Sequence, residues 1–262
     1  MIDIHCHIIP GVDDGPKDLT QALTMARLAV ADGIRVIVAT PHSLNGVYAN
    51  HRRDILEKGR ILKEAFQESN IPLILFFGAD VHFDPDLLSK IEAGEVLPIN
   101  DGKYILLEIP GQSIPQVVKE VLFDLRVKGS FPILTHLERN LMVQKNPELV
   151  GEWVEHGAVI QITAQSLTGD FGGRAYRCAC RLLEKGWVDV IASDGHSTRR
   201  RPPVLSQGVR KAAEIVGREQ AWRMVTHTPE LILRSQALPD KSPSASSSQP
   251  VASGFFSRLF SF

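Results

Sequence analysis

The sequence predicts an α/β protein built around a parallel β-sheet or barrel. Short apolar runs alternate with longer stretches of helical periodicity along most of the chain, which is the order expected of βα units. Two of the apolar runs, IRVIVAT and VDVIASD, are nearly continuous, as expected for parallel strands buried on both faces. The length of 262 residues suits one large α/β domain, because α/β barrels of this size are common as single units.

Seven strands and eight helices are expected. The strands lie near residues 2–6, 34–40, 72–79, 104–109, 132–136, 158–162 and 188–193. The helices lie near residues 18–32, 51–70, 86–93, 114–128, 147–156, 174–186, 206–216 and 219–234. In the first helix Asp18 can cap the start and Gly33 can end it. Its apolar stripe, which should cover the sheet, consists of Leu19, Ala22, Leu23, Ala26 and Val30.

The composition excludes several classes of protein. With 29 basic and 30 acidic residues the net charge is −1, so no overall field attracts nucleic acid, and we expect no nucleic-acid partner. The chain starts without a signal-peptide pattern, and no apolar run approaches the roughly 18 residues of a membrane span. Cys6, Cys178 and Cys180 are too few for a disulfide framework. A cytoplasmic location is therefore expected.

The composition changes near the C-terminus. Residues 1–238 should form the folded domain, and residues 239–254 a Ser/Pro-rich linker that cannot build a core. Residues 255–262, FFSRLFSF, form an apolar end to this expected disordered tail. Such an end is explained either by self-association and packing on the domain, or by contact with a partner protein or a membrane surface.

The chain opens with MIDIHCHIIPGVDDG, which contains two closely spaced histidines. Because side chains alternate along a strand, His5 and His7 should point one way, and Ile4 and Cys6 the other. In a parallel barrel, functional groups gather at the C-terminal ends of the strands. Six of the seven expected strands end in such groups: His5, His7, Asp13 and Asp14; His42; Asp80 and His82; Glu108; His136; Asp194 and His196. Chance scatter does not produce this arrangement.

Convergent histidines and carboxylates without cysteine suit Mn²⁺, Fe²⁺ or Zn²⁺ in mixed nitrogen and oxygen coordination. Any one of these residues could be an ordinary hydrogen-bonded polar group, but the set together indicates a site for two or three ions. Clustered ions can hold a bridging hydroxide at neutral pH and align the attacking and leaving oxygens of a phosphoester. The sequence therefore predicts hydrolysis of a phosphoester by direct attack of such a hydroxide.

Arginines follow two of the metal-binding segments. Arg139 comes one short turn after His136 and could contact a phosphate through two hydrogen bonds. The run Arg199–Arg201 follows His196, and its first two arginines are equally well explained as a solvated basic loop. A cysteine-nucleophile phosphatase needs an arginine six residues after its cysteine, but positions 12, 184 and 186 are Val, Glu and Gly. That mechanism is excluded.

These residues resemble the polymerase and histidinol phosphatase (PHP) superfamily, which combines an opening HxH with a distorted (β/α)7 barrel and three metal ions. MIDIHCHIIPGVDDGPKD, ATPHSLNGVYAN, THLERN, QITAQSLTGDFG and ASDGHS are similar to the bacterial manganese-dependent tyrosine phosphatases of the CpsB/YwqE type, over roughly residues 1–235. The resemblance implies a Mn²⁺ enzyme that acts on a phosphotyrosine protein. Its expected substrate is a membrane-associated tyrosine autokinase that controls capsule or exopolysaccharide synthesis.

The resemblance also implies roles for individual residues. The carboxylate of Asp80 would bridge two ions, and Arg139 and Arg201 would contact the phosphate. The other ligands would fall into three groups: His5, His7 and Asp194; Glu108 and His136; Asp14, His42 and His196.

One position departs from the family pattern, which has Glu where this chain has Asp80. The shorter side chain should require a backbone shift or leave one ion more weakly held, and His82 is a possible local compensation. Two alternative functions remain open. A small-molecule phosphoesterase similar to histidinol phosphatase would share every metal ligand. A binding protein with a decayed site is the other alternative, and Asp80 is the only hint of it in the sequence.

Overall fold

The structure, a computed structural model, describes residues 1–48 and 50–239. The C-terminal tail that was expected to be disordered lies outside the described residues, except for residue 239. This tail comprises the linker and the segment FFSRLFSF. Within them the strands are β1 Ile2–Cys6, β2 Val36–Ala39, β3 His42–Ser43, β4 Ile74–Phe77, β5 Asp80–His82, β6 Tyr104–Glu108, β7 Phe131–Leu134, β8 Val159–Thr163 and β9 Val190–Ala192. Every strand pairing is parallel.

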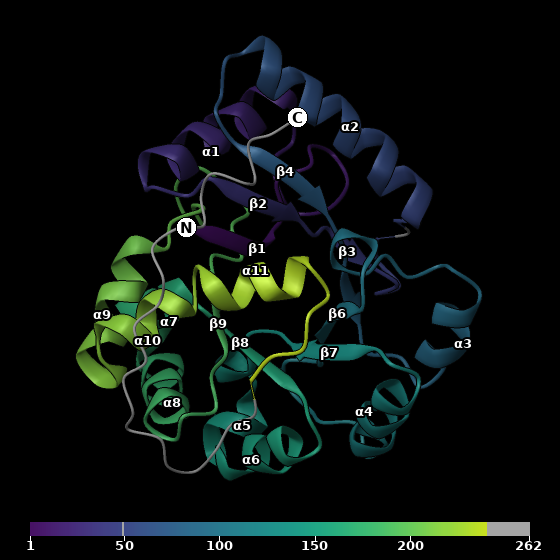
Figure 1. Cartoon of the computed structure of the whole chain (residues 1–262), viewed down its shortest axis with the longest axis vertical. Coiled ribbons are helices and arrows are strands. Elements are labelled where there is room, and N and C mark those ends of the chain that lie inside the picture. Colours follow the sequence, from purple (N-terminus) through teal and green to yellow (C-terminus); the bar gives the residue numbers. More distant parts are fainter. Residues whose placement is uncertain (49, 240–262) are drawn as a thin grey trace.

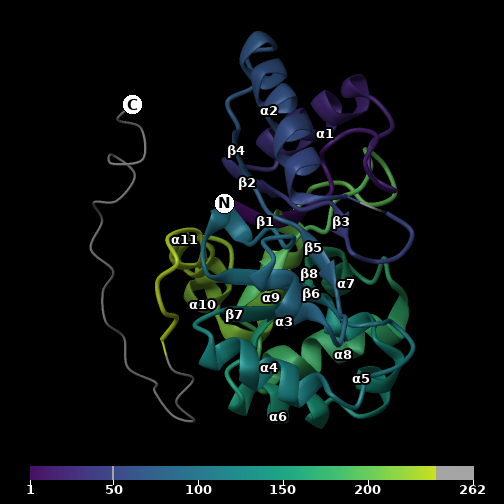
Figure 2. The same ribbon diagram turned by 90° about the vertical axis from the view of Figure 1, so that its right-hand side faces the viewer.

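Helices surround the strands, which lie at the centre of the molecule (Figure 1). They are α1 Leu19–Ala31, α2 Arg52–Glu68, α3 Leu87–Glu92, α4 Val118–Val127, α5 Leu141–Lys145, α6 Glu148–Glu155, α7 Ala164–Thr168, α8 Gly172–Glu184, α9 Ser206–Val216, α10 Arg218–Arg223 and α11 His227–Leu233. Two short 3₁₀ helices cover Ile99–Asp101 and Leu137–Arg139. The turned view shows α1 and α2 covering β2 and β4 (Figure 2). The predicted α/β fold around a parallel sheet is confirmed.

The sheet is curled and divided into two parts. One part has the order β1-β2-β4 and the other β3-β5-β6-β7-β8-β9. The ends of the curl approach each other where the backbone N–H of Asp194 donates to His5 (2.8 Å) and that of His7 donates to Gly195 (2.8 Å). The C-terminal ends of β1 and β9 are therefore adjacent.

Two of the expected strands are broken, which the sequence did not predict. The strand expected near 34–40 ends at Ala39, and β3 resumes at His42 beyond Pro41, which has no N–H to donate to a sheet. The strand expected near 72–79 ends at Phe77, and β5 begins at Asp80. The resumed strands β3 and β5 pair with each other, and β5 also pairs with β6. The breaks move His42 and Asp80 into the larger part of the sheet.

The predicted alternation in β1 is only partly correct. Between its pairings with β2, β1 has one residue more than its partner, so the register shifts between Asp3 and Cys6. As a result Ile4 packs in the inner apolar cluster with Val38, whereas Cys6 packs in the outer cluster beneath the helices. The expectation that Ile4 and Cys6 share a face is wrong. A bulge of this kind re-aims side chains, and here it accompanies the inward turn of His5.

The single helix expected near 219–234 is also wrong. Helix α10 ends at Arg223 and α11 begins at His227, and the intervening Val225 accepts a hydrogen bond from Ile2 N–H (2.8 Å). Pro229 falls in the first turn of α11, where a missing N–H costs nothing because that group has no helical partner. The break lets α11 lie across the strands (Figure 1), where Ile232 joins the inner cluster.

Candidate metal centre

All nine predicted metal ligands lie together at the C-terminal ends of the strands. Each has a nitrogen or oxygen ligand atom within 4.0 Å of a ligand atom of another. His5 and His7 lie at the end of β1 with their Nε2 atoms 3.1 Å apart. Five of the nine are buried, namely His5, His7, Asp80, Asp194 and His196. The side chain of a sixth, His136, is only 11% exposed. The parallel register brings groups that are far apart in sequence to one place.

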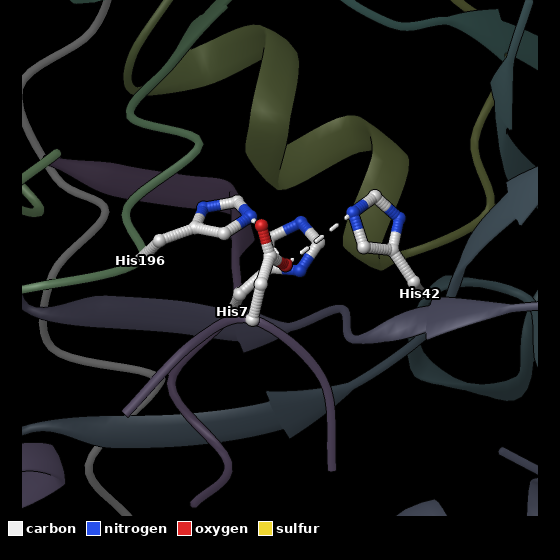
Figure 3. A group of neighbouring side chains, drawn as sticks. His7, His42 and His196 are labelled. Carbon is white, nitrogen blue, oxygen red and sulfur yellow. Dashed lines mark ion pairs between the residues drawn. The ribbon is translucent and has the colours of Figure 1, made fainter. Parts of the chain in front are cut away.

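Three groups of these side chains could each hold a metal ion, because their ligand atoms lie within 4.8 Å of one another. Asp80 belongs to two of the groups and His7 also to two, so the groups adjoin. The groups are His5, His7 and Asp80; His42, Asp80 and Glu108; and His7, Asp14, His42 and His196. Figure 3 shows that the rings of His7, His42 and His196 gather around one point.

Two predicted ligands border these groups without belonging to them. His136 Nε2 lies 3.6 Å from Glu108 Oε1 and 4.0 Å from Asp80 Oδ2. Asp194 Oδ1 lies 3.4 Å from His5 Nε2 and 3.5 Å from His7 Nε2. Both have left-handed backbone conformations, with φ of 37° and 51°. Such conformations are uncommon outside glycine and tend to occur at functional sites.

The shorter carboxylate of Asp80 still reaches the centre of the cluster. Its Oδ2 atom lies 3.4 Å from His42 Nδ1 and 3.6 Å from His5 Nε2, and the side chain is fully buried. Because β5 pairs with β6, His82 stands beside Glu108, with its Nδ1 3.5 Å from Glu108 Oε2. His82 therefore lies at the edge of the centre and contacts one of its carboxylates.

Buried atoms without hydrogen bonds show that the cluster fits a cation. His42 Nδ1, Asp80 Oδ2 and His196 Nε2 are buried, and none makes a hydrogen bond to a described residue. Buried polar atoms normally have partners, because leaving them unpaired costs free energy. A divalent ion among these atoms would satisfy them. The donor set of imidazoles and carboxylates without a thiolate fits Mn²⁺, Fe²⁺ or Zn²⁺.

Burial and charge set the protonation of the cluster. Burial, together with neighbouring histidines, holds the pKa of His7 well below its ordinary value, so its imidazole is neutral, as a metal ligand must be. The adjacent imidazole of His196, whose Nε2 lies 3.3 Å from Asp14 Oδ1, lowers the pKa of Asp14 to about 2. Burial alone would lower the pKa of His42, but the nearby carboxylates of Asp80 and Glu108 raise it to about 9. A proton and a metal ion thus compete for His42.

Two residues outside the predicted ligand set orient the histidines of β1. His7 Nδ1 lies 2.8 Å from Asp13 Oδ2, and His5 Nδ1 lies 2.9 Å from Gln161 Oε1. Hydrogen bonds of this kind fix the ring so that Nε2 points at the metal. Asp13 Oδ2 also accepts from the backbone N–H of His42 (3.0 Å). Gln161 could have been found as the one amide in the strand VIQIT, whereas nothing local distinguishes Asp13 from Asp14.

Arg139 and Arg201 meet at the rim of the cluster. Both donate to the same oxygen, Asp194 Oδ2, at 2.6 Å and 2.5 Å. Burial alone would raise the pKa of Asp194, but the two guanidinium groups and His5 hold it well below its usual range. The two oxygens of this carboxylate thus face different groups: Oδ1 faces imidazoles and Oδ2 faces arginines.

Phe171, which the sequence reasoning did not single out, lies against both arginines. The Cζ atom of Arg139 is 4.7 Å from the centre of its ring and that of Arg201 is 5.9 Å from it. An aromatic face attracts cations at this distance, so the ring helps to hold the two guanidinium groups in place. Arg139 and Arg201 line a pocket of about 250 Å³ together with His42, Glu108, Ile109, Gly111, Thr135, His136, Leu137, Asn140 and Asp194.

Comparison with known proteins assigns the chain to a family. A family model described as "Capsular polysaccharide synthesis, CpsB/CapC" matches residues 1–234, which include every residue of the cluster. The chain belongs to the CpsB/CapC family. The predicted resemblance to the CpsB/YwqE phosphatases is therefore confirmed.

Two relatives of known name and one solved structure support this assignment. The chain is 37% identical over 238 residues to the tyrosine-protein phosphatase YwqE of Bacillus subtilis, which covers 91% of this chain and 93% of YwqE. It is 35% identical over 207 residues to the putative tyrosine-protein phosphatase CapC of Staphylococcus aureus, covering 79% and 81% of the two chains.

The solved structure comes from work on YwqE of B. subtilis and CpsB of Streptococcus pneumoniae, described as unique metal-dependent tyrosine phosphatases. It superposes on this chain with a TM-score of 0.89 at 36% sequence identity, covering 97% of this chain and all of the other. The likeness extends over the whole domain, including the strand ends that carry the cluster.

Proposed function

We propose that this CpsB/CapC family member is a metal-dependent protein-tyrosine phosphatase, which hydrolyses the phosphoester of phosphotyrosine. Its similarity to named tyrosine-protein phosphatases, over 93% of YwqE and 81% of CapC, supports this function over a small-molecule phosphoesterase. The proposed setting is capsule or exopolysaccharide synthesis, and the proposed substrate is a tyrosine kinase of that system. A binding protein with a decayed site is disfavoured because all nine candidate ligands are present and adjacent.

The observation that carries the proposal is the double role of Asp194. One of its oxygens faces His5 and His7, and the other accepts hydrogen bonds from Arg139 and Arg201. Arginines bind phosphate oxygens through the same donors that bind carboxylates. A phosphate in the pocket would therefore find two cationic donors directly beside the imidazole and carboxylate cluster.

The chain's own groups would act as follows. Two or three Mn²⁺ ions are the proposed cofactor, and when bound they supply Lewis-acid activation of water and charge neutralisation. Asp80, which belongs to two of the three candidate groups, would hold ions together with His5, His7, Asp14, His42, Glu108, His136, Asp194 and His196. Asp13 and Gln161 would keep the rings of His7 and His5 turned inward. Arg139 and Arg201 would orient the phosphate for in-line displacement and balance its developing charge.

The leaving group of phosphotyrosine needs less help from a general acid than the leaving group of phosphoserine. The phenol of tyrosine has a pKa near 10, so its anion leaves more readily than an alkoxide. Asp194, which lines the pocket, has its pKa held well below its usual range, so at neutral pH it is an anion and not a proton donor. The chain therefore relies on positioning and charge more than on a general acid.

The proposed domain comprises residues 1–238. We propose that β2 with β3, and β4 with β5, count as two interrupted strands, so that the sheet is the distorted (β/α)7 barrel of the PHP fold. The described residues include no helix that is long and apolar enough to cross a membrane. The three cysteines are free, which suits a reducing compartment, and the proposed location is the cytoplasm. A role for the segment 255–262 in contacting a partner or a membrane lies outside the described residues.

Phosphate release from a phosphotyrosine peptide tests the proposal. The protein is first treated with a chelator and then supplied with Mn²⁺, and the native chain is compared with His136→Ala and Arg139→Ala. Exposed residues far from the cluster give matched controls, namely His227→Ala and Arg218→Ala. We expect Mn²⁺ to restore activity in the native chain and the controls only. Turnover that survives chelation, or that persists in His136→Ala, would contradict the metal-dependent mechanism.

A further inference from the structure

A groove lies between α5 and α8, apart from the pocket lined by Arg139 and Arg201, which is called the phosphate pocket below. The two helices contact each other and stand side by side in both views (Figures 1 and 2). The groove has a volume of about 160 Å³ and is lined by Gln144, Pro147, Arg174, Arg177, Cys178 and Arg181. None of these residues belongs to the metal cluster, and the catalytic proposal leaves the groove without a role.

The groove carries positive charge that the surrounding protein does not neutralise. Arg174 and Arg177 are exposed, and no acidic group of a described residue lies within 4.0 Å of either guanidinium. Arg181, at the far end, is paired with Glu148 and Glu184. Two adjacent unpaired arginines are notable in a chain with a net charge of −1. A local positive patch of this kind favours an anionic partner.

The phosphate pocket adjoins the start of α5, and the groove adjoins its end. Asn140 lines the pocket and caps the start of α5 through its side chain. The next residue, Leu141, donates its backbone N–H to Gly111 (2.9 Å), another residue of the pocket. Leu141 and Met142 are 42% and 41% exposed. Two half-exposed apolar side chains of α5 thus accompany the arginines, and such a mixture suits a surface that accommodates a polypeptide.

Helix geometry gives the spacing between the two sites. Phe171, which contacts both pocket arginines, immediately precedes α8. At 1.5 Å per helical residue, Arg174 and Arg177 lie roughly 5 Å and 9 Å further along the axis. An extended peptide covers about 3.3 Å per residue. A substrate side chain two to four residues from the phosphotyrosine would therefore reach these arginines.

We propose that this docking surface, formed by Leu141, Met142, Gln144, Arg174 and Arg177, binds aspartate or glutamate side chains two to four residues from the phosphotyrosine of the protein substrate. The inference rests on the proposed phosphatase function and specifies the class of substrate. The small volume of the groove and its lack of an aromatic side chain favour a carboxylate over a second phosphotyrosine.

Matched phosphotyrosine peptides test the docking surface. One peptide carries glutamates two to four residues on either side of the phosphotyrosine, and the other carries glutamines there. Both are assayed with the full chain loaded with Mn²⁺, with the double variant Arg174→Gln/Arg177→Gln, and with Arg218→Gln as an exposed control. We expect the native chain and the control to prefer the acidic peptide in kcat/KM by about three- to tenfold, as two exposed ion pairs allow.

The preference should shrink as ionic strength rises, because exposed charges are screened by salt. In the double variant the ratio between the two peptides should approach one. Equal hydrolysis of both peptides by the native chain, or an unchanged preference in the double variant, would overturn the proposal. A preference for a doubly phosphorylated peptide without one for the acidic peptide would overturn it as well.

Peptide affinity, measured by fluorescence anisotropy on the same proteins, separates this proposal from the catalytic one. An arginine-dependent preference for the acidic peptide without hydrolysis would support the docking surface and contradict the phosphatase function. Hydrolysis without the preference would contradict the docking surface alone.

Discussion

The two ends of the same strands behave differently. At the N-terminal end of the sheet, Tyr104 and Ile133 are fully buried in the inner apolar cluster, which Ile232 of α11 closes. At the C-terminal end, Glu108 and His136 continue the same two strands into the candidate metal centre. Most side chains at both ends are buried, but the two ends satisfy their buried atoms in different ways.

Apolar side chains at the first end gain free energy simply by leaving water and packing. Polar side chains at the second end need a partner for each buried atom, and a cation would satisfy several that have none among the described residues. One end should therefore determine the stability of the fold and the other its chemistry. Four substitutions test this division, in order of decreasing expected effect.

Asp194→Asn should have the largest effect on activity. The substitution removes a charge that faces both the imidazoles and the two arginines, while the amide keeps the shape of the side chain. We expect kcat/KM for a phosphotyrosine peptide to fall about 1,000-fold, with bound manganese, measured by elemental analysis, reduced. Near-native activity would show that Asp194 is not central to the site.

Ile133→Ala should act on stability at the opposite end. The side chain is fully buried, and its removal leaves a cavity in the inner cluster. The free energy of unfolding, measured with urea, should fall by about 2–5 kcal/mol. The folded protein should keep its affinity for Mn²⁺. A large loss of metal affinity with normal stability would contradict the division between the two ends.

Asp13→Asn should weaken metal binding without removing a proposed ligand. Asp13 holds the His7 ring and the backbone of His42, so its charge orients two ligands. Isothermal titration should show an affinity for Mn²⁺ about 10–100-fold lower. Asp18→Asn is the matched control, because it alters a carboxylate that only caps α1 and asparagine caps equally well. An equal loss in both variants would indicate a general effect of charge.

Phe171→Leu should have the smallest effect. Leucine retains apolar bulk but loses the aromatic face that attracts Arg139 and Arg201. We expect kcat/KM to fall about two- to tenfold, with weaker inhibition by inorganic phosphate. Phe171→Tyr should restore both values. If tyrosine fails to rescue the phosphate inhibition constant, then the ring matters for packing and not for the arginines.

Much of the site could be predicted because the end of a buried strand is visible in the sequence, as the point where an apolar run gives way to polar residues. His42, Asp80, Glu108 and His136 each follow a short apolar run, and parallel pairing places such positions at one edge. That these four side chains lie close together could be predicted without knowing how the side chains pack. The strand breaks at Pro41 and before Asp80 were harder to predict, because a short interruption resembles the end of a strand.

The residues that were missed act through contacts between distant segments. Gln161 meets His5 across 156 positions of sequence, and Phe171 meets Arg201 from a different loop. The helix break after Arg223 likewise depends on the bond between Val225 and Ile2. No local periodicity carries such information.

The amino-acid sequence by itself determined the order of strands and helices, the polar residues at the strand ends and the chemical class of ions they suit. These properties depend on local patterns, namely the alternation of apolar residues and the identity of donor atoms. Only the tertiary structure decided which nitrogen of each ring faces the cluster, how Asp80 reaches three histidines, and that Asp194 joins the imidazoles to the arginines. Those outcomes depend on the curl and register of the sheet, which arise from packing of the whole chain.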